Sequence, residues 1–458
     1  MDRRTFGKGA AATAIGLGLT RRAKAAETLT VWWVKGFYKS EDDALFEAIK
    51  KYEAKSGVKV ELSQYAVQDM IPKTVSALDA GTVPDVAYAD VYDFQVAGKW
   101  AFDGKLEDIS DVLVPMKDRF APNTLETVHL YSDKAKKKAY YAFPQKQQTM
   151  HIQYWIDMVE DAGFKESDIP KGWKDYWAFW CDKVQPGIRK KTGKRLFGIG
   201  QPMGVDSSDS FYSFLTFADA YNVELVDENG KLLVDDPKVK EGLVGALGDY
   251  VMPYEKGCTP PSSTSWKDPD NNVAFHNKTT VMTHNATISI AAKWLDDMNN
   301  TTLSDAERAQ AKKNYEELIR TAGFPNKPDG SPMQYRAAVK VGCVFAESKN
   351  KQRAKEFVQF HLEEENLTPY VEGALGRWFP VMKAAQERPF WQQDRHRKSV
   401  YDQFKQGTVT FEFTRNWKFT ILNNENVWAK AMNRVVNEKV PVDKAVDEMI
   451  ARIKTVAG

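Results

Sequence analysis

Cysteine and histidine are scarce in this sequence. Its 458 residues include three cysteines and six histidines. The cysteines, Cys181, Cys258 and Cys343, lie far apart, and none belongs to a Cys-x-x-Cys pair. This pattern argues against a zinc site and against a disulfide framework. One disulfide is possible, but we expect three buried thiols, and we expect neither a metal ion nor a cofactor.

The motifs of common catalytic sites are missing as well. The sequence has no Gly-x-Ser-x-Gly elbow, no His-Glu-x-x-His pair and no phosphate-binding loop that ends in Gly-Lys-Ser/Thr. Gly198, Gly200 and Gly204 miss the dinucleotide-binding spacing by one residue, and Pro202 would interrupt the helix that this motif requires. These absences favour a binding protein over an enzyme.

Long apolar runs are absent after the N-terminus. Arg3 and Arg4 precede an apolar run, residues 10–19, that is about half as long as a bilayer crossing and is followed by Ala23-Lys24-Ala25. This pattern is typical of a removable export signal. We therefore predict a signal peptide at residues 1–26, cleaved near Ala25-Ala26, and a periplasmic protein. The paired arginines favour twin-arginine export of a folded chain over ordinary export.

The sequence after this signal has no excess of positive charge. The full chain has 64 basic and 62 acidic residues, but residues 1–25 hold six of the basic residues and one of the acidic ones. The remaining 58 basic and 61 acidic residues give a net charge of −3. Such a surface has no general attraction for polyanions, so we expect no nucleic-acid partner.

Strands and helices are predicted to alternate along the chain. The pattern indicates strands at 28–33, 58–62 and 85–89 and helices at 41–55 and 71–78, followed near the C-terminus by a helix at 440–453. This order predicts an α/β fold with mainly parallel sheets, whose ligands bind beyond the carboxyl ends of the strands. About 430 residues exceed what one core holds, so we expect two lobes.

Seven segments resemble, in order, those of the extracellular solute-binding proteins of carbohydrate ABC importers, the maltose-binding-protein-like group. The clearest are the turn Gly81-x-x-Pro84-Asp85, the stretch 274–282, in which Lys278 replaces the usual glycine, and the turn Gly376-x-x-x-Pro380. The other segments are residues 29–62, 142–144, 152–157 and 349–357. The likeness covers essentially the whole chain after the signal.

The resemblance implies a two-lobed periplasmic-binding-protein fold of type II with a ligand cleft between the lobes. It places one lobe at 27–143 plus 337–383 and the other at 144–336 plus 384–458, with an insertion at 295–335 that is partly helical around 306–319. It also implies a monomer that captures a sugar or oligosaccharide and delivers it to the subunits of an ABC permease. Closure around the ligand would occur by hinge motion.

Aromatic residues make up 12% of the chain, and many lie beside polar residues at predicted strand ends. Aromatic rings stack on the C–H faces of sugars, and amides and charged groups bond their hydroxyls. His284 and Asn285 replace a Gly-x-Trp that is common in the family, which indicates a more polar contact. The predicted ligand-binding residues are Trp33, Lys35, Tyr38, Gln64, Tyr65, Asp90, Tyr92, Gln148, Gln201, Asp206, Tyr212, His284, Asn285, Arg377 and Trp378.

Two alternatives remain open. A protein of the same fold could bind a phosphorylated polyol, an osmolyte or another polar solute, and Lys35, Lys146 and Arg377 would suit an anion. Carboxylate pairs such as Asp206 and Asp209 could serve an exported carbohydrate-active enzyme. Binding without turnover would separate the receptor from the enzyme.

Overall fold

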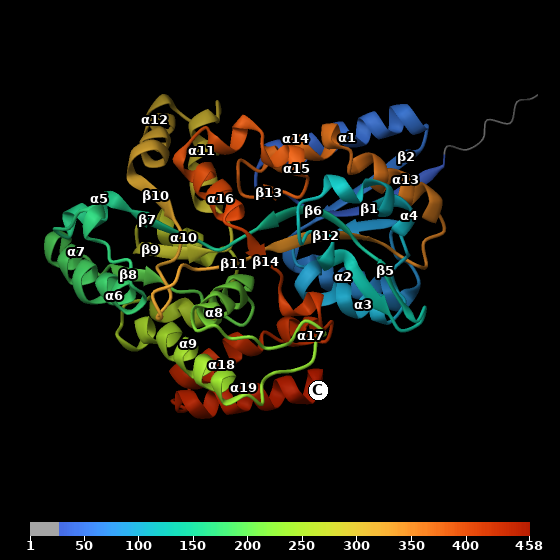
Figure 1. Ribbon diagram of the computed structural model, residues 1–458. Coiled ribbons are helices and arrows are strands. Elements are labelled where there is room, and N and C mark those ends of the chain that lie inside the picture. The colour runs from blue at the N-terminus through green and yellow to red at the C-terminus, as the bar shows by residue number, and fades with distance from the viewer. Residues whose placement is uncertain (1–26) are drawn as a thin grey trace, which may run out of the picture.

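The computed structural model describes residues 27–458. The predicted export signal, residues 1–26, lies outside the described residues. None of the helices in the described part of the chain is long and apolar enough to cross a membrane. Figure 1 shows two α/β lobes side by side, with strands running between them.

The first lobe is built on a six-stranded sheet in the order β13-β6-β12-β3-β1-β2. Alternating residues of the first strand, Leu29, Val31 and Trp33, are buried, as the β-rich pattern predicts. The strands are β1 (Thr28–Val34), β2 (Lys59–Tyr65), β3 (Val86–Tyr88), β6 (Phe143–Gln148), β12 (Ala338–Val344) and β13 (Phe379–Pro380).

Helices cover this sheet. Helix α1 (Lys39–Ser56) spans the predicted helix at 41–55 and buries a stripe of Leu45, Ile49 and Tyr52, and it ends at Gly57, which adopts a left-handed φ of 70°. The predicted first helix is therefore confirmed. The other helices here are α2 (Val67–Ala80), α3 (Gly98–Phe102), α4 (Ser110–Leu113), α13 (Lys351–His361), α14 (Glu364–Gly373) and α15 (Lys383–Gln386).

The second lobe is built on a four-stranded sheet in the order β10-β7-β9-β8. Its strands are β7 (His151–Trp155), β8 (Phe197–Gly200), β9 (Thr280–Asn285) and β10 (Ile319–Ala322). The remaining helices are α5 (Ile156–Asp161), α6 (Trp173–Ala178), α7 (Gln185–Thr192), α8 (Ser208–Ala220), α9 (Pro237–Glu255), α10 (Asp270–His276), α11 (Ser289–Asn299), α12 (Asp305–Lys313), α16 (Arg395–Lys405), α17 (Phe419–Asn424), α18 (Val427–Val436) and α19 (Val442–Ala457).

The expectation of mainly parallel sheets is wrong for both lobes. In the first sheet only β1–β2 and β1–β3 are parallel, whereas β12 and β13 pair antiparallel with their neighbours. In the second sheet only β8–β9 is parallel. Part of the reason is topological: β12 and β7 enter their sheets from the other lobe without a crossover helix, and each runs antiparallel to both of its neighbours.

Three connections join the two sheets. The chain leaves β6 at Gln148 and enters β7 at His151, and it returns between β10 and β12 through β11 (Tyr335–Arg336). A final connection follows β13 and includes β14 (Thr408–Val409), which pairs parallel with β11. A separate hairpin is formed by β4 (His129–Ser132) and β5 (Lys137–Tyr140). The exact lobe boundaries given above remain predictions.

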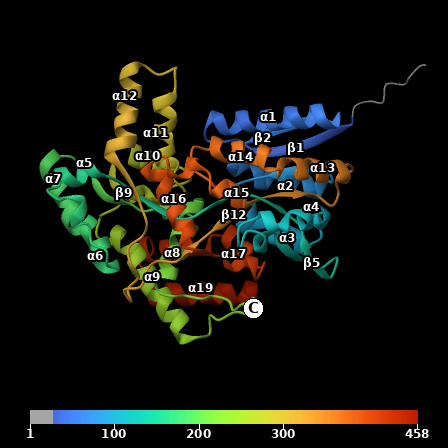
Figure 2. The same ribbon diagram turned by 45° about the horizontal axis from the view of Figure 1, so that its top comes forward.

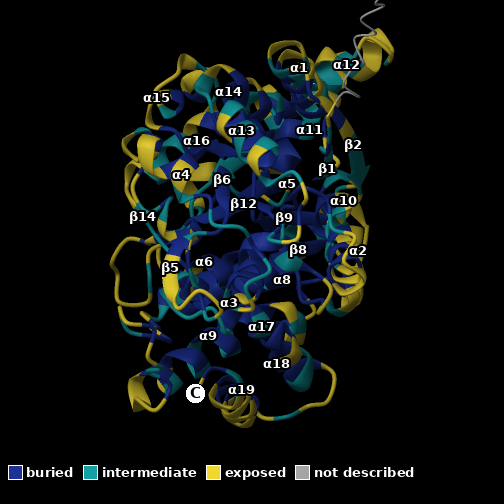
Figure 3. Ribbon diagram, turned by 90° about the vertical axis from the view of Figure 1, so that its right-hand side faces the viewer, coloured by how far each residue is buried: buried dark blue, intermediate teal, exposed yellow. Residues whose placement is uncertain are grey.

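Each lobe has a core of its own. One large cluster of buried side chains surrounds the first sheet and another surrounds the second, and Figure 3 shows buried residues continuing between them. The predicted C-terminal helix is confirmed by α19, which buries Val446, Met449, Ile450 and Ile453. The predicted helical part of the insertion is confirmed by α12 and a π-helical turn at Asn314–Leu318, and α11 and α12 stand side by side in Figure 2.

The expectation of three buried thiols is wrong. Cys181 and Cys258 form a disulfide, with Cα atoms 5.2 Å apart, and Cys343 remains a buried free cysteine. The fold brings the pair together because the π-helical turn that holds Cys181 packs against strand β8, and β8 also bonds the Cys258 backbone. The two cysteines are 77 residues apart in the sequence, so no local pattern indicated that they would meet.

Candidate functional site

A small cavity of about 70 Å³ lies between the lobes. The first lobe contributes residues from the loops after β1 and β3, from β12 and from the turn before β13, and the second contributes the start of α8, the start of α10 and the segment after β9. Its walls combine aromatic rings with carboxylates, amides and hydroxyls. Such a chamber holds polar groups through many hydrogen bonds.

The cavity adjoins a groove of about 690 Å³. Val67, Val91, Ser208 and Asp268 line both spaces, so the two lie next to each other. The chamber alone is smaller than the roughly 300–1,000 Å³ of a typical ligand pocket. A ligand of monosaccharide size or larger must therefore either widen the chamber or extend into the groove.

Arg377 forms much of the first wall. Its guanidinium lies 3.6 Å from the ring centroid of Phe37 and 4.3 Å from that of Trp378, so the cation is held between two aromatic faces. The Nη2 atom lies 3.2 Å from Asp90 Oδ2, whereas the buried Nε has no hydrogen-bond partner. Gly376, with a φ of 91°, makes the turn that places Arg377 here.

Asp90 belongs to a buried network of charges behind this wall. Lys146 Nζ lies 2.5 Å from Glu41 Oε1 and 3.9 Å from Asp90 Oδ1, and the Tyr88 hydroxyl donates to Asp90 at 2.5 Å. Although burial opposes it, the positive charges of Lys146 and Arg377 lower the pKa of Asp90. Asp90 is therefore held as a carboxylate.

A second ion pair extends from this wall toward the other lobe. Lys340, on β12, lies 3.2 Å from Asp93 and donates to the Tyr212 hydroxyl on α8 at 2.7 Å. Burial raises the pKa of Asp93 to about 6, and the nearby Lys340 ammonium limits this rise. Burial lowers the pKa of Lys340. Both cations that line the chamber are thus paired with carboxylates.

The second wall is acidic. Asp268 accepts hydrogen bonds from the Ser207 hydroxyl at 2.7 Å and from the Ser208 backbone at 3.0 Å. Asp209 accepts from the Asn271 amide at 2.8 Å. Burial and the neighbouring charge of Asp268 raise the pKa of Asp209. Asn285 donates to Asn272, which in turn donates to Ser289, so this wall is ordered before any ligand arrives.

The chamber brings together six of the residues predicted from the sequence. Four were expected at strand ends or in the turn before β13, and two come from the second lobe. They are Asp90, Gln148, Tyr212, Asn285, Arg377 and Trp378. Asp206 is exposed and lines the outer groove instead. Whether these side chains bind ligand stays a prediction.

Other predicted residues of the first lobe do not line the chamber. Trp33 is fully buried in the core and donates to the Tyr370 hydroxyl. Tyr38 is buried and donates to the backbone of Ser289 across the lobe boundary. Gln64 donates to Asp42, Tyr65 packs edge-on against Trp32, and Tyr92 bonds Thr74 inside the core. Lys35, in the loop after β1, is exposed outside the chamber.

Two predicted residues of the second lobe lie in its core. His284 is fully buried and bonds Gln201 at 2.7 Å and Ser213 at 2.9 Å. Gln201 also donates to the backbone of Tyr250. His284 and Asn285 are consecutive on β9, so their side chains point to opposite faces and only Asn285 reaches the chamber.

Sequence reasoning missed several residues that line the chamber. Lys340 interrupts the apolar strand β12, and a lysine inside such a strand is a signal that could have found it. Phe37, Asp268 and Asn271 lie in loops or at a helix start, where the sequence shows no hydrophobic periodicity of a helix or strand. Only the tertiary fold brings these four together.

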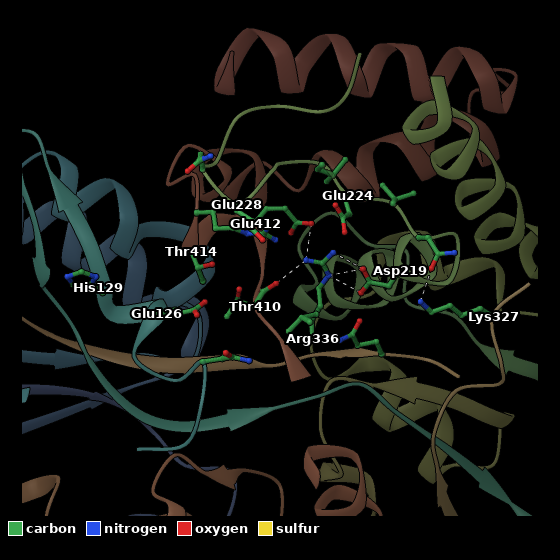
Figure 4. A pocket seen from close by; sticks show the side chains of 18 of the residues that line it. Glu126, His129, Asp219, Glu224, Glu228, Lys327, Arg336, Thr410, Glu412 and Thr414 are labelled. Carbon is green, nitrogen blue, oxygen red and sulfur yellow. Dashed lines mark hydrogen bonds and ion pairs between the residues drawn. The ribbon is translucent and has the colours of Figure 1, made fainter. Parts of the chain in front are cut away.

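A second groove, of about 720 Å³, lies near the β11–β14 pair, and none of the predicted ligand-binding residues lines it. Figure 4 shows Arg336 between Asp219 and Glu412, with ion-pair distances of 2.7 and 3.0 Å. Burial raises the pKa of Asp219 to about 6, and the Arg336 charge limits this rise. These ion pairs anchor the connection that carries β11 between the sheets.

The fold and the chamber define a class: two-lobed binding proteins whose site lies between α/β lobes joined by several crossing segments. Residues 47–399 match the model of the bacterial extracellular solute-binding protein family, and the chain belongs to this family. Within the described residues, no group of histidine, cysteine or acidic side chains could hold a metal ion.

One curated protein with a similar sequence is named for the oligosaccharide that it binds. An arabinooligosaccharide-binding protein from Bacillus subtilis (strain 168) is 29% identical over 223 residues, which are 47% of this chain and 46% of that protein. The chain therefore spans about half the length of this curated relative.

Solved structures share the fold along nearly the whole chain. An ABC transporter solute-binding protein from Thermotoga lettingae TMO, bound with alpha-D-tagatose, has a TM-score of 0.74 and 19% identity, and the match covers 94% of this chain and 100% of that one. The maltotriose-binding protein of Thermus thermophilus has a TM-score of 0.67 and 20% identity, covering 94% and 100%. The predicted two-lobed periplasmic-binding-protein fold is thus confirmed.

Proposed function

We propose that this protein is the substrate-binding component of an ABC importer for a sugar or oligosaccharide. The observation that carries the proposal is the interlobe chamber, in which both lobes present aromatic rings beside carboxylates and amides. Each sugar hydroxyl both donates and accepts, and these groups supply both roles. The arabinooligosaccharide-binding relative and the sugar-bound structural neighbours support a carbohydrate ligand.

Closure would couple binding to transport. Lys340 meets Tyr212 across the chamber, and the hydroxyl of Tyr38 donates to Ser289 of the other lobe. A chamber of about 70 Å³ between such contacts must open to admit a sugar. Ligand contacts to both lobes then favour the closed form, which the permease subunits recognise. The protein acts in this scheme as a periplasmic monomer, exported by the twin-arginine route.

The alternatives have less support. A phosphorylated ligand needs a free cation in the chamber, whereas Arg377 and Lys340 are both paired with carboxylates. An inverting glycosidase needs two carboxyl groups that flank one bond, but Asp206 is exposed in the outer groove and Asp209 is buried in the chamber. We therefore propose binding without catalysis.

A thermal-shift screen of the mature protein tests the proposal. The panel contains monosaccharides, arabino- and malto-oligosaccharides, polyols and phosphorylated polyols. A ligand at 100 times its Kd should stabilise the protein by roughly 2.7 kcal/mol. Chromatography of each sugar that binds, after incubation with the protein, should recover it unchanged. No shift with any sugar would contradict the proposed ligand class, and released product would favour the enzyme.

A further inference from the structure

The charges around the chamber do not balance. On the first wall three cations, Lys146, Arg377 and Lys340, face three carboxylates, and every one of the six lies within 4.0 Å of an opposite charge. The carboxylates are Glu41, Asp90 and Asp93. The first wall is therefore neutral as a whole.

The second wall adds two carboxylates and no cation. Among the described residues, no lysine, arginine or histidine forms an ion pair with Asp209 or Asp268. Both line the chamber, and Asp209 is only 8% exposed. Their hydrogen-bond donors are neutral: two serines, two backbone amides and the Asn271 side chain.

Asp209 is buried and Asp268 is half-buried, and a buried carboxylate beside a second carboxylate is costly to keep charged when no cation is paired with it. Burial and, after it, the neighbouring charge of Asp268 raise the pKa of Asp209, while Arg377 acts from across the chamber in the opposite direction. A proton on Asp209 relieves the repulsion when no other positive charge is present. A ligand cation at the same place would relieve it too, and it would bond both carboxylates directly.

We propose that the solute carries a protonated amine, as in an amino sugar or amino polyol, and that Asp209 and Asp268 receive its ammonium group. This inference rests on the proposed function and narrows its ligand class. The amine would lie against the second wall while the hydroxyls of the same solute bond Gln148, Asn285 and the first wall. Binding would displace the proton of Asp209, which passes to the solvent.

Matched pairs of sugars test this inference by calorimetry at pH 7. The pairs are glucose with glucosamine, galactose with galactosamine and mannose with mannosamine, each measured in two buffers of different ionisation enthalpy. At least one amine should bind about tenfold tighter than its hydroxyl partner. Its binding should also release a proton in proportion to the fraction of Asp209 that was protonated.

Asp209→Asn should abolish both the amine preference and the proton release. Asp161→Asn removes an exposed carboxylate on α5, outside the chamber, and should change neither. If the hydroxyl sugars bind as tightly as the amines, the inference is overturned and the proposed function stands. If none of these six sugars binds, the inference fails, and the thermal-shift screen above decides the proposed function separately. If Asp209→Asn does not fold, the comparison of amine and hydroxyl sugars on the wild-type protein still tests the inference.

Discussion

Lys340 of strand β12 donates a 2.7 Å hydrogen bond to the hydroxyl of Tyr212 on helix α8, and this bond joins the two lobes beside the chamber. Both side chains are buried, with Lys340 1% and Tyr212 4% exposed. Because neither water nor another residue replaces a buried bond cheaply, the contact favours the arrangement of the two lobes seen in this structure. It links the charge network of one lobe to helix α8 of the other, which lines the chamber.

Tyr212→Phe should therefore open the ligand-free protein. The variant loses the acceptor for Lys340, which keeps its pairing with Asp93. We expect a larger radius of gyration by small-angle X-ray scattering and a loss of about 1–2 kcal/mol in unfolding free energy. The control is Tyr250→Phe, which removes a bond to the Pro202 backbone within the second lobe. It should cost stability without opening, and identical scattering for wild type and Tyr212→Phe would contradict the argument.

Arg377→Ala should strongly destabilise the first lobe. It removes a buried cation 3.2 Å from Asp90, and breaking a buried pair typically costs about 3–5 kcal/mol. Arg377→Lys keeps the charge but loses the planar stacking between Phe37 and Trp378, so we expect an intermediate loss in urea unfolding. Arg388→Ala breaks a surface pair with Glu372 and should cost at most about 1 kcal/mol. Equal losses of unfolding free energy for Arg377→Ala and Arg388→Ala would refute the buried placement of Arg377.

Removal of the disulfide should lower the stability of the second lobe. Joint replacement of Cys181 and Cys258 by serine should cost about 2–5 kcal/mol of unfolding free energy. A thiol reductant should lower the melting temperature of the wild type and of Cys343→Ser, but not that of the double variant. A wild type that melts identically with and without reductant would show that the bond does not form.

Buried His284 should make the protein less stable in acid. Burial lowers the pKa of His284 to about 3, whereas an unfolded histidine titrates near about 6.5. As pH falls below about 6.5, the unfolded chain gains a proton at His284 that the folded chain excludes. This contribution to folding stability is therefore fully present above pH 6.5 and is lost progressively between pH 6.5 and pH 3. The loss should approach about 1.4 kcal/mol per pH unit for this residue.

His284→Gln removes this contribution. Urea unfolding at pH 7, 6 and 5 should show that the stability difference between wild type and variant shrinks as pH falls. His129 is exposed, so His129→Gln should show a smaller change. A difference that stays constant with pH would mean that His284 is not held neutral in the folded state.

The sequence alone determined the local elements of this protein and its family likeness. Apolar periodicity located α1, α19 and the first three strands, because such periods depend on neighbours within a few residues. The order of the seven family-like segments indicated the two-lobed fold. Positions after β3, at the end of β6 and before β13 led to Asp90, Gln148 and Arg377, which line the chamber.

The tertiary structure decided what depends on distant partners. It set strand direction, paired Cys181 with Cys258, and put His284 in the core while Asn285 faces the chamber. It also brought Asp268, on a loop of one lobe, to the same chamber as Lys340 of the other. A linear pattern records which residues are polar, but the balance of buried charge depends on distances between lobes, and only the folded chain fixes these.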